Sequence, residues 1–216
     1  MKKPLKIRYY SPGEENLNII SHALGLVLSI VGSFFLLLRA LALNDLGLFL
    51  SFLAFGLSLV LLYLASTLYH STRDLRKRYA LEIFDHIAIF ILIAGSYTPF
   101  AVVTLNGPTG WIIFGVVWGI AILGTIIKLF FTGRFKIVST LLYVGMGWVI
   151  IFAIEPLQEN LSSPGLWWLF SGGLAYTLGA LVYSISKIKF NHAIFHLFVL
   201  AGSYCHFMAI YNHVVP

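Results

Sequence analysis

Three histidines, an aspartate and a serine have the types and the spacing to hold a metal ion and use it. His192 and His196 are four residues apart, as are Ser66 and His70, and Asp85 follows in the next apolar segment. Residues four apart on a helix lie on one face, one turn from each other, so each pair can point at one place. Three imidazoles with one open coordination position can form a catalytic zinc site, and a nearby carboxylate can serve as its general base.

The elements that would position these side chains are long apolar helices. Of the 216 residues, 59% are hydrophobic and 10% are charged, whereas an ordinary soluble domain carries about 25% charged residues. Runs of about 20 apolar residues can cross a bilayer as helices, which satisfy their own backbone hydrogen bonds in lipid. We therefore predict an all-α integral membrane protein, a bundle of seven transmembrane helices. The expected spans are 19–38, 47–69, 84–104, 110–130, 137–154, 165–186 and 192–213.

The basic residues predict how this bundle is oriented. All but Arg39 of the 14 lysines and arginines lie on alternate connections, and such residues collect in cytoplasmic loops. We expect a plasma (inner) membrane protein with its amino terminus in the cytoplasm and its carboxyl terminus outside. Residues 1–18 would form a short cytoplasmic basic tail, and 19–216 the transmembrane domain, with the first span retained as an anchor and not cleaved as a signal. The basic residues concerned are Lys2, Lys3, Lys6, Arg8, Arg73, Arg76, Lys77, Arg78, Lys128, Arg134, Lys136, Lys187 and Lys189.

The net charge of +6 does not indicate a nucleic-acid-binding protein. The positive charges are spread over four short connections, where we expect them to meet anionic lipid headgroups. The predicted partners are membrane lipids and a lipid-like substrate or ligand, with no nucleic acid. A single cysteine, Cys205, excludes a disulfide within the chain and a thiolate metal cluster, so nitrogen and oxygen would have to hold any metal.

In the predicted orientation the candidate residues share one depth, near the cytoplasmic leaflet. Ser66 and His70 end the second span, Asp85 opens the third, and His192 and His196 open the seventh. Ionisable side chains are costly in hydrocarbon, so such a cluster indicates a functional site. Each motif alone also has a plainer interpretation. The histidine pair could bond to backbone or water, the serine could be a packing residue, and the aspartate could cap a helix.

A further polar stripe lies on the first helix, at and just before the start of the first span. Glu15, Asn18 and His22 fall on one helix face, where they would either orient the metal ligands or, for Glu15, cap the helix start. His206 lies about 15 Å beyond His196 by helix rise, too far to share one ion. It would either line a cavity or a proton path, or pack toward the bundle interior.

Two further signals are architectural. Gly115 and Gly119 form a GxxxG motif, which predicts close helix packing. Pro99 is expected to kink the third span.

Four motifs together resemble the hemolysin III family, the bacterial branch of the progestin and adipoQ receptor (PAQR) superfamily. They are ExxNxxxH in the first helix, SxxxH in the second, DHIAIFILIAGSYTP in the third and HAIFHLFVLAGSYCHF in the seventh. The resemblance implies seven helices with the amino terminus inside, and a zinc ion near the inner leaflet. It implies His70, His192 and His196 as the zinc ligands, and Asp85 as a carboxylate that contacts the zinc through water, with Ser66 beside it.

The resemblance leaves three functions open. Animal members are associated with ceramidase-like amide hydrolysis, which favours a zinc-dependent hydrolase of lipid-like amides or esters; zinc lowers the pKa of its bound water to about 7. Other bacterial members are linked to membrane fluidity and energy homeostasis, which favours a non-enzymatic lipid sensor with a structural zinc. The family name suggests a pore-forming or cytolytic protein, but no span carries a row of polar residues along its full length.

Overall fold

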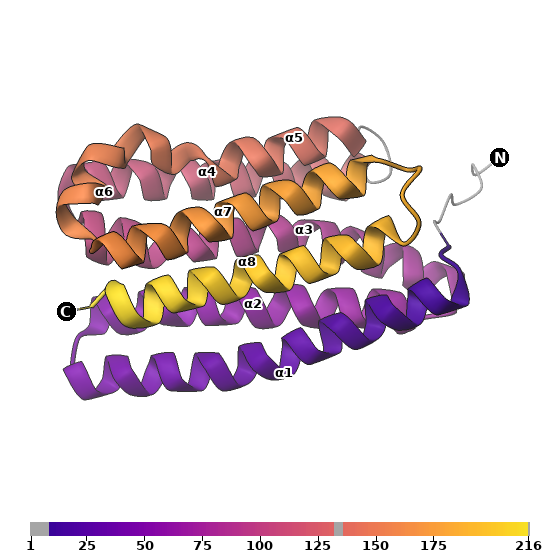
Figure 1. Cartoon of the computed structure of the whole chain (residues 1–216), viewed down its shortest axis with the longest axis horizontal. Helices are drawn as coiled ribbons and strands as arrows, with labels where there is room; N and C mark the ends of the chain where they lie inside the picture. Colours follow the sequence, from indigo (N-terminus) through magenta and orange to yellow (C-terminus); the bar gives the residue numbers. More distant parts are fainter. Residues whose placement is uncertain (1–8, 132–135, 216) are drawn as a thin grey trace.

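Seven helical spans lie side by side along one long axis in a computed structural model that describes residues 9–131 and 136–215 (Figure 1). Each is long and apolar enough to cross a membrane, and the described residues contain no strand, which confirms the predicted fold class. The start of α1 and the end of α8 lie at opposite ends of the bundle (Figure 1). The elements are α1 (Pro12–Leu43), α2 (Leu46–Ser71), α3 (Leu75–Pro99), η1 (Phe100–Leu105), α4 (Gly107–Phe131), α5 (Lys136–Gly147), η2 (Val149–Ala153), α6 (Ile154–Asn160), α7 (Ser163–Ser184) and α8 (Asn191–His213).

Two helices begin well before the apolar runs that predicted them. The Ser11 side chain caps α1, which starts at Pro12, so residues 12–18 of the expected tail are helical. The Asp74 side chain caps α3 by accepting a hydrogen bond from the Lys77 amide at 2.9 Å. Asp85 therefore lies ten residues inside α3, and its interpretation as a helix cap is wrong.

The orientation relative to the cytoplasm stays a prediction. Several of the basic residues that support it lie outside the described residues, or have side chains outside the described part. These are Lys2, Lys3, Lys6, Arg8, Arg134 and Lys136.

The helices close into a ring in which successive spans are neighbours. α1 packs on α2, α2 on α3 and α3 on α4; α5 lies against α3, α4 and α7, and α7 packs on α8, which returns to α1. Small residues allow the close approaches, since a Cβ atom at Gly95 of α3 would meet the Ala54 carbonyl of α2 at 3.1 Å. Phe52 and Phe55 of α2 are fully buried, whereas large apolar side chains such as Phe130 and Phe152 face outward. An apolar outer surface of this kind suits contact with lipid tails.

Two spans depart from regular α-helix. The third changes to π-helical geometry at Phe100, directly after Pro99, the residue where the sequence predicted an irregularity in the form of a kink. The fifth span breaks at Trp148 between α5 and the 3-10 turn η2. The Tyr97 hydroxyl donates to the Gly147 carbonyl at 2.7 Å and accepts from the Ile150 amide at 2.9 Å, so one side chain satisfies both backbone groups at the break.

The GxxxG prediction is wrong within this chain. A Cβ atom at Gly115 or Gly119 would meet nothing within 4 Å. The motif lies on a part of α4 that does not pack closely on another helix of the described chain.

Candidate metal centre

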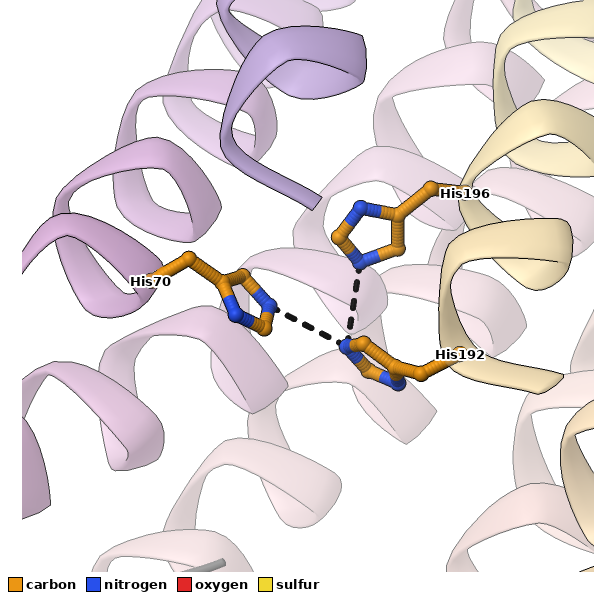
Figure 2. Close-up of side chains that lie close together, drawn as sticks. All are labelled: His70, His192 and His196. Carbon is orange, nitrogen blue, oxygen red and sulfur yellow. Dashed lines mark hydrogen bonds between the residues drawn. The ribbon is translucent and has the colours of Figure 1, made fainter. Parts of the chain in front are cut away.

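Three imidazoles from two helices converge at the end of the bundle where α1 begins (Figure 2). His70 is the penultimate residue of α2, and His192 and His196 occupy the first two turns of α8. The Nε2 atom of His192 lies 3.1 Å from the Nε2 atoms of both His70 and His196. All three side chains are buried, at 2%, 6% and 1% exposure respectively. The sequence prediction that these residues come together is therefore met.

The geometry of this histidine centre fits a zinc ion. Tetrahedral zinc with Zn–N bonds of about 2.0–2.1 Å places its nitrogen ligands about 3.4 Å apart. Two of the three nitrogen pairs are close to that spacing, and the candidate ligand atoms all lie within 4.8 Å of one another. A small movement of His70 and His196 toward each other would allow all three nitrogens to reach one ion. The three nitrogens leave a fourth coordination position to a group from outside the histidine set.

Two of the three imidazoles are held by polar groups of α1. The Nδ1 atom of His70 lies 2.9 Å from a Glu15 carboxylate oxygen, and the Asn18 amide nitrogen lies 3.4 Å from the same atom. The Ser21 hydroxyl lies 3.3 Å from Nδ1 of His196. Partners of this kind fix the orientation and tautomer of metal-binding histidines. Glu15 and Asn18 of the stripe on α1 thus contact a candidate ligand, and Ser21 extends the stripe; that they orient metal ligands stays a prediction.

Arg78 completes a buried ion pair behind the histidine centre. Its guanidinium group hydrogen-bonds the second carboxylate oxygen of Glu15 and also donates to the Thr72 carbonyl at 3.1 Å. It lies over the faces of the Tyr9 and Tyr69 rings, 5.1 and 4.7 Å from their centroids. From the sequence alone Arg78 is one residue of a basic loop, because nothing local connects it to a carboxylate 63 residues earlier.

The residues just before and at the start of α1 cover the histidine centre. The ring of Tyr10 stacks on His192 with centroids 4.6 Å apart and an interplanar angle of 22°. The Glu14 carboxylate accepts a hydrogen bond from the His192 amide at 3.3 Å. Neither residue was predicted as part of the site. Glu14 could have been noticed as an acidic neighbour of the polar stripe, whereas Tyr10 has no local signal.

Asp85 and Ser66 lie beside the histidines on the wall of one cavity. This cavity, of about 150 Å³, is lined by both residues and by His192 and His196. Asp85 lies within electrostatic range of His86, of His70 and of the Ser66 hydroxyl. That hydroxyl is buried and lies outside standard hydrogen-bond geometry for any described partner. The structure thus brings the predicted carboxylate and hydroxyl to the edge of the centre, without placing either as a fourth member of the histidine group.

Two further histidines near this end of the bundle take different positions. His22 is 3% exposed and stacks on His196 with ring centroids 3.5 Å apart, so it supports that imidazole by ring packing. Nδ1 of His86 donates to the Glu82 carbonyl at 2.6 Å, while the ring lines the cavity. Neither belongs to the group of nitrogens that converge on one point.

The ring of seven spans and the buried histidine triad define a multi-pass membrane protein with a candidate metal centre. A family model described as "Haemolysin-III related" matches residues 10–207, and the chain belongs to this hemolysin III family. The resemblance inferred from the four motifs is thereby confirmed.

Relatives are found in bacteria and in animals. The chain is 45% identical to "Hemolysin-3" of Bacillus cereus, over 94% of this chain and 93% of that protein. It is 43% identical to the "Hemolysin-3 homolog" of Bacillus subtilis (strain 168), over 94% and 95%. It is also 30% identical to the human "Monocyte to macrophage differentiation factor", a PAQR-family protein, over 93% of this chain and 84% of the human protein.

Proposed function

We propose that the protein is a membrane-embedded zinc hydrolase acting on an amide or ester bond of a lipid-like substrate. The observation that carries this proposal is the convergence of three imidazole nitrogens beside a cavity that the Asp85 carboxylate also lines. Three nitrogen ligands with an open position are typical of catalytic zinc sites, whereas structural zinc sites are closed by four protein ligands.

Each side chain has a distinct part in the proposed reaction. His70, His192 and His196 would hold the zinc, which when bound supplies a Lewis acid and an activated water at neutral pH. Asp85 would take the proton from the attacking water and return it to the leaving amine or alcohol. Glu15 keeps the imidazole of His70 in position through its bond to Nδ1.

The cavity suits a substrate with an apolar portion. From the histidine centre it continues between the helices along Leu62, Ile89, Leu92 and Val199. Such a lining would hold an acyl chain and keep bulk water away from the reacting carbonyl. We propose that the substrate comes from the surrounding membrane lipids and that the centre lies near the cytoplasmic leaflet.

The decisive first experiment is the zinc content of detergent-purified protein. We expect about one zinc per chain in the wild type and its loss in the His192→Ala/His196→Ala double variant. His213→Ala is the matched control, because this histidine lies on the same helix but bonds to Ser162 at 2.8 Å, away from the cavity. Wild-type protein without metal after zinc is supplied would refute the zinc centre.

Hydrolysis is tested separately on the Asp85→Ala variant. Lipid amides and esters, beginning with a ceramide, are incubated with the zinc-loaded wild type and with this variant. The variant should retain most of its zinc and lose turnover, because the general base is gone while the three nitrogen ligands remain. Full turnover by zinc-loaded Asp85→Ala would show that Asp85 is not the base.

A lipid sensor with a structural zinc is the second candidate, favoured by the cover that Tyr10 places over His192. It predicts tightly held zinc and no turnover of any lipid amide or ester. A pore-forming or cytolytic function, suggested by the name of the Bacillus relatives, predicts dye release from liposomes that contain only this protein.

A further inference from the structure

His206 lies in α8 at the end of the cavity away from the histidine centre. It is ten residues beyond His196, a separation of about 15 Å along a helix. Its side chain is buried, at 8% exposure, and neither ring nitrogen has a hydrogen-bond partner among the described residues. The Leu169 carbonyl interacts with the ring but does not meet hydrogen-bond geometry. A buried imidazole that makes no hydrogen bond of standard geometry is costly, so this position calls for an explanation.

The imidazole of His206 is held in place by the neighbouring helix. Gly172 of α7 packs so closely on the ring that a Cβ atom there would meet Nε2 at 2.6 Å. The ring of Tyr176 meets it edge-on, with centroids 5.3 Å apart. The ring is therefore fixed by packing on its sides, while it also lines both the main cavity and a smaller pocket that adjoins it.

Other polar groups at this end of the cavity already have protein partners. The Ser96 hydroxyl donates to the Ile93 carbonyl at 2.8 Å, and the Trp148 indole donates to the Thr177 hydroxyl at 3.0 Å. The Tyr97 hydroxyl is engaged at the break of the fifth span. Among the described side chains that line both pockets, His206 is the one whose hydrogen-bonding capacity is unused.

We propose that His206 is a second polar binding point, which recognises a hydroxyl group on the apolar part of the ligand. A neutral imidazole donates at one nitrogen and accepts at the other, and a hydroxyl matches either role. The ligand class is then an amphiphile with two polar groups about 15 Å apart. The first group sits at the histidine centre, and the second is a hydroxyl along the acyl portion. This assignment rests on the proposed function for the placement of the first group, but it requires binding and not turnover.

The test compares two probes that differ by a single hydroxyl. Binding of radiolabelled stearic acid and of stearic acid hydroxylated at mid-chain is measured by equilibrium dialysis of the detergent-purified, zinc-loaded protein. All measurements are made in the Asp85→Ala background as well as in the wild type. Because this variant is expected to lose turnover, hydrolysis cannot affect its binding readout. The variants are His206→Phe, which removes the hydrogen bonds, and His206→Gln, which retains hydrogen-bonding capacity. His213→Phe is the control on the same helix.

The wild type should prefer the hydroxylated acid by about threefold to tenfold, the contribution of one net hydrogen bond. The preference should vanish in His206→Phe, persist in part in His206→Gln and remain complete in His213→Phe. Equal binding of both probes by the wild type, or an unchanged preference in His206→Phe, would overturn the proposal. If His206→Phe does not fold, His206→Leu, which also removes the hydrogen bonds, takes its place: loss of the preference in the folded leucine variant supports the proposal, and full retention there opposes it. If the protein prefers the hydroxylated acid but hydrolyses no lipid, the proposed hydrolase function is refuted, while the role of His206 in binding is supported.

Discussion

Replacing Glu15 by glutamine should weaken zinc binding without removing a ligand. The carboxylate lies 2.9 Å from Nδ1 of His70, and glutamine keeps the shape of the side chain while losing its charge. Loss of such a partner typically lowers metal affinity by about 10–100-fold, which corresponds to about 1.4–2.7 kcal/mol. Because glutamine can still accept a hydrogen bond and the Glu15 side chain is 17% exposed, we expect a value near tenfold.

The same substitution should also lower stability, through Arg78. The Arg78 side chain is only 3% exposed, and its guanidinium group would lose its carboxylate partner. Breaking a buried ion pair from one side costs about 3–5 kcal/mol. The partial exposure of Glu15 and the remaining bond from Arg78 to the Thr72 carbonyl place the expected cost at or below the lower end.

Two assays separate these effects. Zinc affinity is measured by competition with a chelating dye, and stability by thermal unfolding in detergent. Arg78→Met should reduce stability but weaken zinc binding less than Glu15→Gln does, because the contact between Glu15 and His70 remains. Glu159→Gln is the control, because Glu159 lies in α6, at the end of the bundle opposite the start of α1 (Figure 1). Wild-type zinc affinity in folded Glu15→Gln would refute the role assigned to the carboxylate.

Three further predictions follow from packing and from the cover of the site. Gly95→Ala should destabilise the protein by about 1–3 kcal/mol because its Cβ atom would collide with α2, whereas Gly115→Ala, with open space around it, should not reduce the melting temperature. Tyr97→Phe should lower stability by about 1–3 kcal/mol in thermal unfolding, because it leaves two backbone groups at the helix break without a partner. Tyr10→Ala should let a hydrophilic chelator remove zinc severalfold faster in stopped-flow measurements, because it removes the ring that stacks on His192.

Much of the fold follows from hydropathy, because a chain in lipid must place apolar side chains outward along each span. The seven spans were predictable for this reason, as was the shared depth of His70, His192 and His196 at the ends of their helices. The start of α3 was not, because its first turns carry Arg76, Lys77 and Arg78, which hydropathy assigns to a loop.

The face that a residue presents to its neighbours could not be obtained from spacing alone. The GxxxG motif of α4 has the pattern of a packing motif but does not pack closely within the described chain. Conversely, the bond of Glu15 to His70 joins residues 55 positions apart, and only the assembled bundle brings them together. Gly145 and Gly147, at the end of α5, are a sequence signal for the break in the fifth span. Hydropathy does not register this signal, because it reports how apolar a segment is and not how well it forms a helix.

The separation of the histidines along the chain has a consequence for how the protein is made. His70 and His192 are 122 residues apart, and Glu14 bonds to an amide 178 residues later. Domains are made from the amino terminus onward, so His70 enters the membrane long before the helix that completes the triad. A chain that stops before α8 can insert most of its spans and still hold no three-histidine centre. Possession of a metal by the three histidines would therefore distinguish fully assembled molecules from incomplete ones in the same membrane.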